Sequence, residues 1–121
     1  MTEQGLERNF VEWCKSKNIQ AVKGPVTTSK GFPDRFVQLP NGGGTIYVEF
    51  KGTSDYGLSP LQLWWSEYIK QSSPHRYFLV DDEAKLERLK RACLAFMKVG
   101  AAIVAYEKRL LIEVCGDSDK K

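Results

Sequence analysis

The chain has 121 residues, of which 42% are hydrophobic and 27% are charged, and its formal net charge is +3 at pH 7. This length suits one buried core, so we predict a single domain over residues 1–115 and a polar tail over 116–121. Three widely spaced cysteines and one histidine argue against a structural zinc site and favour reduced thiols in a cytoplasm. We expect no membrane partner, because no apolar run reaches the roughly 18 residues that a bilayer span requires.

The first predicted element is a helix over Glu3–Lys17, where apolar residues recur at helical spacing. A short strand over Ile19–Val22 follows this helix. The stretch from Lys23 to Pro33 is rich in glycine, proline, serine and threonine, and this composition predicts a loop.

A β-hairpin is predicted next. Its strands cover Arg35–Leu39 and Thr45–Lys51, and the turn Pro40–Gly44 between them contains three glycines that permit positive φ. We expect this turn to place Leu39 opposite Thr45.

A second helix is predicted from Ser59 to about Gln71. Ser59 is a suitable N-cap, proline follows at the first helical position, and Gln62 completes a capping box. Tyr77–Val80 reads as a short apolar strand.

A third helix is predicted from a cap at Asp81 or Asp82 to about Lys98, with Gly100 as its end. Two further strands, Ala101–Tyr106 and Leu110–Val114, complete the predicted fold. The result is an α/β fold with a mixed central sheet flanked by helices and with extra C-terminal strands.

The residues that point to chemistry lie on the hairpin. Side chains alternate along a strand, so Glu49 and Lys51 share the face opposite the apolar residues Ile46, Val48 and Phe50. The expected register places Asp34 opposite Phe50 and diagonal to Glu49 and Lys51. Two carboxylates and one ammonium group therefore converge on a small patch.

Two carboxylates about 5 Å apart repel each other by a few kcal/mol at an effective dielectric constant near 20. A bound Mg²⁺ ion removes this penalty, because it prefers oxygen ligands from carboxylates, backbone carbonyls and water. Asp34, Glu49 and the carbonyl of Phe50 are the predicted ligands. Lys51 is expected to orient the attacking water or to stabilise the transition state of phosphodiester hydrolysis.

The Pro33-Asp34 pair followed by Glu49-Phe50-Lys51 resembles the motif of the PD-(D/E)XK nuclease superfamily. With the surrounding segments Gly31–Asp34, Tyr47–Lys51 and Leu58–Trp65, the chain is similar to the VRR-NUC (virus-type replication-repair nuclease) family. The resemblance covers roughly Glu3 to Glu87.

This resemblance implies a restriction-endonuclease-like fold with an αβββαβ core. It also implies a homodimeric, structure-selective DNA endonuclease of bacterial or phage type, which cuts branched substrates such as four-way junctions with Mg²⁺ or Mn²⁺. The family has a metal-associated glutamate on its first helix, for which Glu7 is the first candidate and Glu3 the second. A family glutamine on the helix after the E-x-K motif matches Gln62, which joins the candidate catalytic residues Asp34, Glu49 and Lys51.

Other interpretations of these residues stay open. The capping box alone explains Gln62, and a helix-surface acid explains Glu7. Lys23, Lys30 and Arg35 flank the proposed metal site and are candidates for contacts with DNA phosphates. The loops Thr27–Lys30 and Thr53–Gly57 are expected to wall the cleft.

Aromatic residues on the second helix offer a further choice. Trp64, Trp65 and Tyr68 could stack on nucleobases, but apolar helix faces usually pack in a core, which is our prediction for Trp65 and Tyr68. Two function classes compete with the nuclease: a non-catalytic nucleic-acid-binding module of the same fold, and a protein-interaction module. A sequence-specific, restriction-like enzyme is the alternative within the nuclease class.

Overall fold

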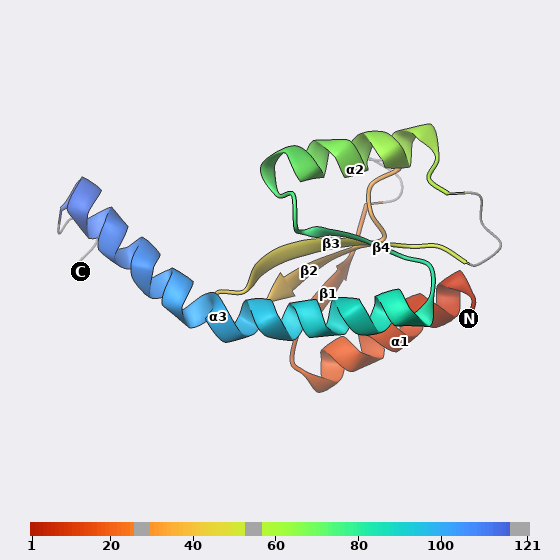
Figure 1. Ribbon diagram of the computed structural model, residues 1–121, viewed down its shortest axis with the longest axis horizontal. Helices are drawn as coiled ribbons and strands as arrows, with labels where there is room; N and C mark the ends of the chain where they lie inside the picture. The colour runs from red at the N-terminus through yellow and green to blue at the C-terminus, as the bar shows by residue number, and fades with distance from the viewer. Residues whose placement is uncertain (26–29, 53–56, 117–121) are drawn as a thin grey trace.

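A four-stranded mixed sheet lies between helices in the computed structural model, which describes residues 1–25, 30–52 and 57–116. Helices α1 (Glu3–Ser16) and α3 (Glu83–Cys115) cover one face of the sheet, and α2 (Pro60–Ser72) lies on the other (Figure 1). The described chain therefore has three layers and belongs to the α/β class, as the sequence predicts.

The four strands follow the chain order across the sheet. They are β1 (Gln20–Lys23), β2 (Arg35–Leu39), β3 (Gly44–Phe50) and β4 (Tyr77–Val80). The β1–β2 and β2–β3 pairs are antiparallel, whereas β4 runs parallel to β3 after the crossover through α2. The predicted hairpin is thus confirmed as the β2–β3 pair.

The main core fills the space between the sheet and the α1–α3 layer. On β3, Ile46, Val48 and Phe50 are fully buried, which confirms the predicted apolar face of this strand. The two helices contribute three buried residues each to the same cluster: Leu6, Phe10 and Cys14 from α1, and Leu86, Leu89 and Cys93 from α3.

Local capping signals fix the starts of α2 and α3. The Ser59 hydroxyl accepts from the Gln62 N–H and the Gln62 side chain accepts from the Ser59 N–H, so the predicted capping box is present. For α3, the N-cap is Asp82, whose carboxylate accepts from the Lys85 N–H at 2.7 Å. Of the two candidate caps, Asp82 is the one used.

The expected hairpin register is wrong by one residue. Leu39 pairs with Gly44 and Gln38 with Thr45, so the turn is one residue shorter than predicted. Gly44 joins the strand with φ +81°, a conformation that glycine adopts without steric cost. The register pairs Arg35 with Val48, so one residue further along it places Asp34 opposite Glu49 rather than Phe50.

The two predicted C-terminal strands are also wrong. Residues 101–106 and 110–114 belong to α3, which continues through Gly100 to Cys115. Glycine usually costs a helix interior about 1 kcal/mol, but here the tip of the hairpin packs against it. A Cβ atom at Gly100 would overlap the backbone at Asn41 and Gly42, so a tertiary contact explains this glycine.

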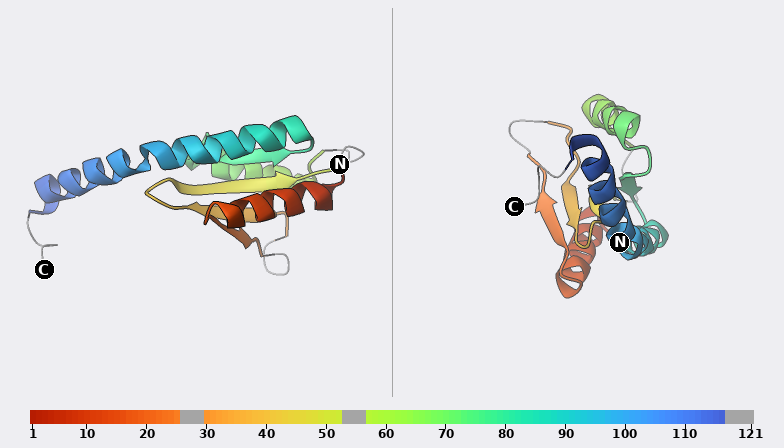
Figure 2. Two further views of the ribbon diagram at one scale, coloured as in Figure 1. Left: turned by 90° about the horizontal axis from the view of Figure 1, so that it is seen from below. Right: turned by 90° about the vertical axis from the view of Figure 1, so that its left-hand side faces the viewer.

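The second half of α3 extends past the end of the sheet, away from the other helices (Figure 2). Every residue from 101 to 111 is exposed. Within the described ranges, no helix combines the length and the apolar character that crossing a bilayer would need.

Candidate active site

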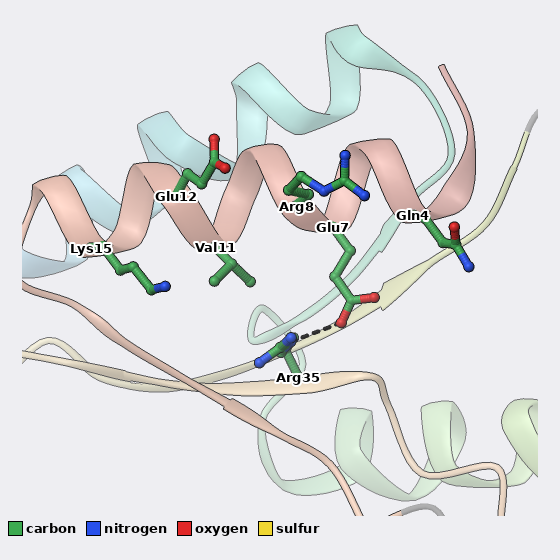
Figure 3. Close-up of a pocket in the computed structure, with 7 residues that line it drawn as sticks. All are labelled: Gln4, Glu7, Arg8, Val11, Glu12, Lys15 and Arg35. Atoms are coloured by element: carbon green, nitrogen blue, oxygen red, sulfur yellow. Dashed lines mark hydrogen bonds and ion pairs between the residues drawn. The ribbon is translucent and has the colours of Figure 1, made fainter.

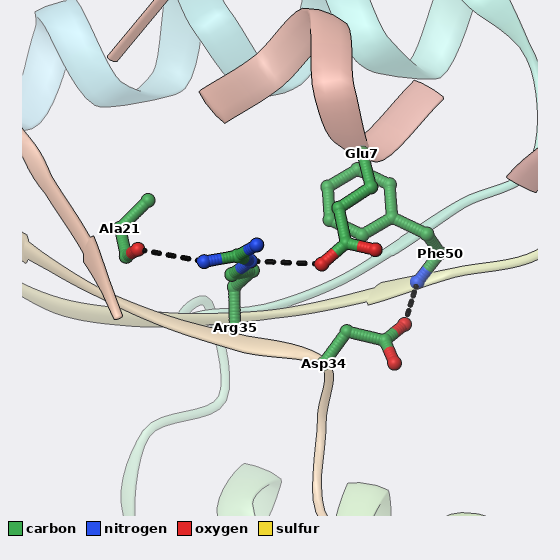
Figure 4. A network of polar contacts seen from close by, with 5 residues as sticks. All are labelled: Glu7, Ala21, Asp34, Arg35 and Phe50. Carbon is green, nitrogen blue, oxygen red and sulfur yellow. Dashed lines mark hydrogen bonds and ion pairs between the residues drawn. The ribbon is translucent and has the colours of Figure 1, made fainter. Parts of the chain in front are cut away.

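Asp34 lies directly before β2, where the chain enters the sheet. Its Oδ2 atom accepts a hydrogen bond from the backbone N–H of Phe50 at 2.8 Å (Figure 4). This bond ties the carboxylate of Asp34 to the end of β3, beside Glu49 and Lys51. The hairpin therefore brings these three residues together as predicted, although the register differs by one residue.

Glu49 is a charged residue type at a buried position, with an exposed fraction of 2%. Its Oε2 atom accepts a hydrogen bond from Nε2 of Gln62 at 3.0 Å. The Oε1 atom of Gln62 meanwhile accepts from the Ser59 N–H at 2.9 Å. Gln62 thus caps α2 and contacts the candidate site through the two ends of one amide, so the two interpretations of this residue coexist.

Burial and mutual repulsion disfavour the ionised forms of both acids. Burial raises the pKa of Glu49 to about 8, assisted by the negative charge of Asp34. Burial also raises the pKa of Asp34, in the same direction as the charge of Glu7, while the Phe50 N–H bond opposes this shift. Ionising two buried acids that lie side by side is unfavourable unless a positive charge lies next to them.

Lys51 supplies one such charge. It directly follows β3 and is half-buried, and its backbone N–H continues the parallel ladder by donating to the Val80 carbonyl at 2.9 Å. Its ammonium group lowers the pKa of both Asp34 and Glu49. Both acids nevertheless keep raised pKa values, so this single ammonium group compensates the pair only partly.

Glu7, the first candidate for the acid on α1, forms an ion pair with Arg35. Its Oε2 atom lies 2.8 Å from Arg35 Nε, and Arg35 Nη1 also donates to the Ala21 carbonyl at 3.1 Å (Figure 4). The second candidate, Glu3, contributes its negative charge to the raised pKa of Glu49. Both acids on α1 therefore act electrostatically on the Asp34–Glu49 pair.

Arg35 points toward α1 and is engaged there, whereas Lys23 and Lys30 are exposed. The Glu7–Arg35 pair borders a surface pocket beside α1 (Figure 3). The residues that line it are Gln4, Glu7, Arg8, Val11, Glu12, Lys15 and Arg35. Asp34 and Glu49 do not line this pocket. Residues 27–29 and 53–56, which belong to the loops expected to wall the cleft, lie outside the described residues.

Tyr77 was not among the predicted site residues. It begins β4, and burial together with the charge of Glu49 raises its pKa to about 12. The parallel register pairs Tyr77 with Tyr47, two residues before Glu49. Sequence reasoning missed this neighbour because nothing local predicts how a parallel strand aligns after a helical crossover.

The aromatic residues of α2 divide differently from the prediction. Trp65 is half-buried and packs edge-on against Phe32 with 5.0 Å between ring centroids. Tyr68, predicted to be core, is 54% exposed and stacks on Trp64, which is 56% exposed. These two rings lie on the outer side of α2.

The donors at this site are hard oxygen atoms. In the described ranges no group of three or more His, Cys, Asp and Glu side chains is placed to hold a metal ion. The candidate ligands stay the two carboxylates of Asp34 and Glu49 and the backbone carbonyl of Phe50, the last residue of β3. Such a set suits Mg²⁺, which commonly keeps several waters and takes one or two protein carboxylates.

A scan of the sequence against protein-family models finds no match, and a search of curated proteins finds none either. The relation to the VRR-NUC family therefore stays a prediction from the motifs.

Proposed function

We propose that this protein is a divalent-metal-dependent nuclease that hydrolyses DNA phosphodiester bonds. The observation that carries the proposal is the convergence of Asp34, Glu49 and Lys51 at the end of the β2–β3 hairpin, with Phe50 and Gln62 holding the two acids. These are the group types that phosphodiester hydrolysis needs: carboxylates for a cation and an ammonium group for developing negative charge.

Mg²⁺, for which Mn²⁺ can substitute, is the cation that we assign to Asp34, Glu49 and the Phe50 carbonyl. When bound, such an ion polarises a phosphoryl oxygen and lowers the pKa of a coordinated water. Because Glu49 is nearly inaccessible while Asp34 and Lys51 are half-buried, ion and phosphate approach from the side of Asp34 and Lys51. The negative charges of Glu3 and Glu7 favour cation binding electrostatically.

The protein groups have separate tasks in this proposal. Lys51 stabilises negative charge on the phosphate during attack, and its ammonium group also orients the attacking water. Gln62 is a positioning residue that fixes the Glu49 carboxylate through one hydrogen bond. The Phe50 N–H does the same for Asp34.

The fold supports this proposal at the level of element order. The described chain reads α1, β1, β2, β3, α2, β4, which is the αβββαβ order expected for a restriction-endonuclease-like core. Fold alone does not define a substrate, so the assignment depends on the site residues. Branched DNA, including four-way junctions, is the substrate class that we propose to test first.

The experiment measures cleavage of supercoiled plasmid and of a synthetic four-way junction with Mg²⁺, with Mn²⁺ and with chelator. We expect Asp34→Asn, Glu49→Gln and Lys51→Ala each to reduce the cleavage rate by at least about a hundredfold. Glu67→Gln is the matched control, because Glu67 is an exposed acid on α2 and its variant should retain full activity.

Binding of Mg²⁺ is measured independently of cleavage. The ion should raise the melting temperature of the wild-type protein and of Lys51→Ala, but not that of Asp34→Asn. Undiminished cleavage by all three site variants would contradict the proposal. DNA binding without cleavage under any divalent ion would instead assign the protein to non-catalytic nucleic-acid binding.

A further inference from the structure

The outer side of α3 carries a row of basic side chains. At 100° per residue, four of them fall within an arc of about 80°. This arc lies opposite the side of the helix that packs in the core through Leu86, Leu89 and Cys93. All four side chains are exposed, and we call them the basic stripe: Arg88, Arg91, Lys98 and Arg109.

Small side chains separate the basic groups of this stripe. Ala84, Ala95 and Ala102 are exposed and lie on the same arc of the helix. Tyr106 follows them on this arc, and Glu113 is the acid at its far end. An extended partner can therefore lie close to the helix between the basic groups.

The basic stripe has no partner within residues 1–25, 30–52 and 57–116. No hydrogen bond or ion pair joins any of its four side chains to another group there. Lys85 and Lys90, on other sides of the same helix, are by contrast paired with Asp81 and Glu87. The positive charge of the stripe is therefore available to a negatively charged ligand.

Helix α3 also accounts for the net charge of the chain. Its seven bases and four acids leave a charge of +3, which equals the net charge of all 121 residues, so the remainder of the chain is neutral. The stripe extends over about 32 Å of the helix, at 1.5 Å per residue. One turn of duplex DNA covers a similar length, about 34 Å, and carries phosphates throughout. A duplex backbone therefore matches the stripe in charge and in length.

We propose that the basic stripe binds the phosphate backbone of duplex DNA, at a surface separate from the candidate active site. Helix α3 covers one face of the sheet, whereas α2, which contacts Glu49 through Gln62, lies on the other (Figures 1 and 2). The stripe holds a segment of duplex away from the cleaved bond, without reading its sequence, because phosphate contacts carry no base information. The choice of DNA as the polyanion rests on the proposed nuclease function.

An anionic lipid surface fits this stripe less well than a duplex does. Helices that bind lipid surfaces insert an apolar face next to their basic residues. In the first half of α3 that face is already occupied, since Leu86, Leu89 and Cys93 are buried in the core. Arg88 and Arg91 would therefore contact lipid headgroups with no apolar insertion beside them.

The test measures binding of a fluorescently labelled linear duplex of about 20 base pairs, two helical turns, to the full chain by anisotropy. Chelator is present, so that no divalent ion contributes. Arg91→Gln with Lys98→Gln removes two charges from the middle of the stripe. We expect the slope of log affinity against log salt to decrease by about 2, and the dissociation constant at about 0.1 M salt to rise at least about tenfold.

Lys70→Gln with Lys108→Gln is the matched control, because it removes the same charge from exposed positions outside the stripe. Its dissociation constant should stay within about threefold of the wild-type value. Arg91→Lys with Lys98→Arg keeps both charges and should retain the wild-type slope. An unchanged slope in the stripe variant, or an equal loss of affinity in the matched control, would overturn the proposal.

This assay separates the stripe from the nuclease activity. Stripe-dependent binding without cleavage under any divalent ion would contradict the proposed nuclease and support the binding surface. Cleavage of DNA whose binding does not depend on the stripe would contradict the binding surface alone. Stripe-dependent binding to phosphatidylserine vesicles, with no binding of the duplex, would assign the stripe to a lipid surface and overturn the proposal.

Discussion

Gln62 joins the N-cap of α2 to the carboxylate of Glu49. Its side-chain oxygen accepts from the Ser59 N–H at 2.9 Å, and its side-chain nitrogen donates to Glu49 Oε2 at 3.0 Å. A helix start and a buried acid are thus held by one amide group. The position of the Glu49 carboxylate therefore depends on α2, although Glu49 lies in the sheet and Gln62 lies in the helix layer.

Ser59→Ala and Gln62→Leu separate the two roles of this amide. Ser59→Ala removes the acceptor for the Gln62 N–H and should lower the free energy of unfolding by about 1 kcal/mol. Gln62→Leu also deprives buried Glu49 of a donor and should cost about 1–3 kcal/mol. Urea unfolding measures both. The cleavage rate should decrease far more in Gln62→Leu than in Ser59→Ala. Equal decreases would mean that Gln62 acts only as a capping residue.

The raised pKa of Glu49 predicts a stability that depends on pH. Between about 4.5, its ordinary value, and about 8, its value in the fold, the folded state retains a proton that the unfolded state loses. The Glu49 contribution to stability therefore decreases as pH rises through this window and is constant above it. Urea unfolding without divalent ions should show a decrease in free energy between pH 5.5 and pH 8 that Glu49→Gln lacks.

Two further measurements refine this prediction. At pH 8, Glu49→Gln should be more stable than the wild-type protein, because it removes a buried charge next to Asp34. Mg²⁺ should restore part of the wild-type stability at pH 8 and have a smaller effect at pH 5.5, where the acids are protonated to a greater extent. Identical pH profiles for the two proteins would exclude Glu49 as the titrating group.

The Glu7–Arg35 pair should act mainly on stability. Arg35 also donates to the Ala21 carbonyl, so it connects α1, β1 and β2. Arg35→Met leaves Glu7 without its partner, and we expect a loss of about 1–3 kcal/mol in urea unfolding. A double-mutant cycle with Glu7→Gln isolates the coupling between the two side chains.

The exposed pair Asp81–Lys85, four residues apart at the start of α3, is the comparison for this cycle. Lys85 Nζ lies 2.8 Å from Asp81 Oδ1, but both side chains are exposed to solvent. The coupling free energy between these two side chains should therefore be below about 0.5 kcal/mol. If the two pairs gave the same small coupling, Arg35 would be available for another role. The phosphate contact predicted from the sequence would then regain support.

The Gly100→Ala substitution should lower the stability of the protein, although a glycine-to-alanine change inside a helix usually raises it. Alanine normally stabilises a helix interior by about 1 kcal/mol relative to glycine. Here its Cβ would overlap the backbone of the hairpin turn, so Gly100→Ala should destabilise the protein by about 1–3 kcal/mol. Ala102→Gly, two residues away and exposed, should show the ordinary cost of about 1 kcal/mol. A stabilised Gly100→Ala variant would contradict the close contact between hairpin and helix.

Features set by neighbouring residues could be predicted from the sequence. The capping box at Ser59, the cap at Asp82 and the alternation along β3 each depend on backbone preferences within a few residues. The approach of Asp34 to Glu49 and Lys51 followed from the same kind of signal, a glycine-rich turn between two short strands. The one-residue difference in register mattered, because opposite residues share a face: the observed register puts Asp34 on the face of Glu49, whereas the predicted one would have put it on the buried face of Phe50.

Features set by contacts between distant segments could not be predicted in this way. Gly100 looks like a helix end until the hairpin turn packs against it, and the residues after it have enough β-branched character to suggest strands. Glu7 finds Arg35 only because α1 lies across β2, and Tyr77 reaches the Glu49 face only through a parallel register. Local sequence determined the elements up to the start of α3 and the acid-lysine cluster of this protein. Packing between segments distant in the chain decided the length of α3, the partners of the charged residues and the burial of Glu49, since each depends on atoms that sequence spacing does not locate.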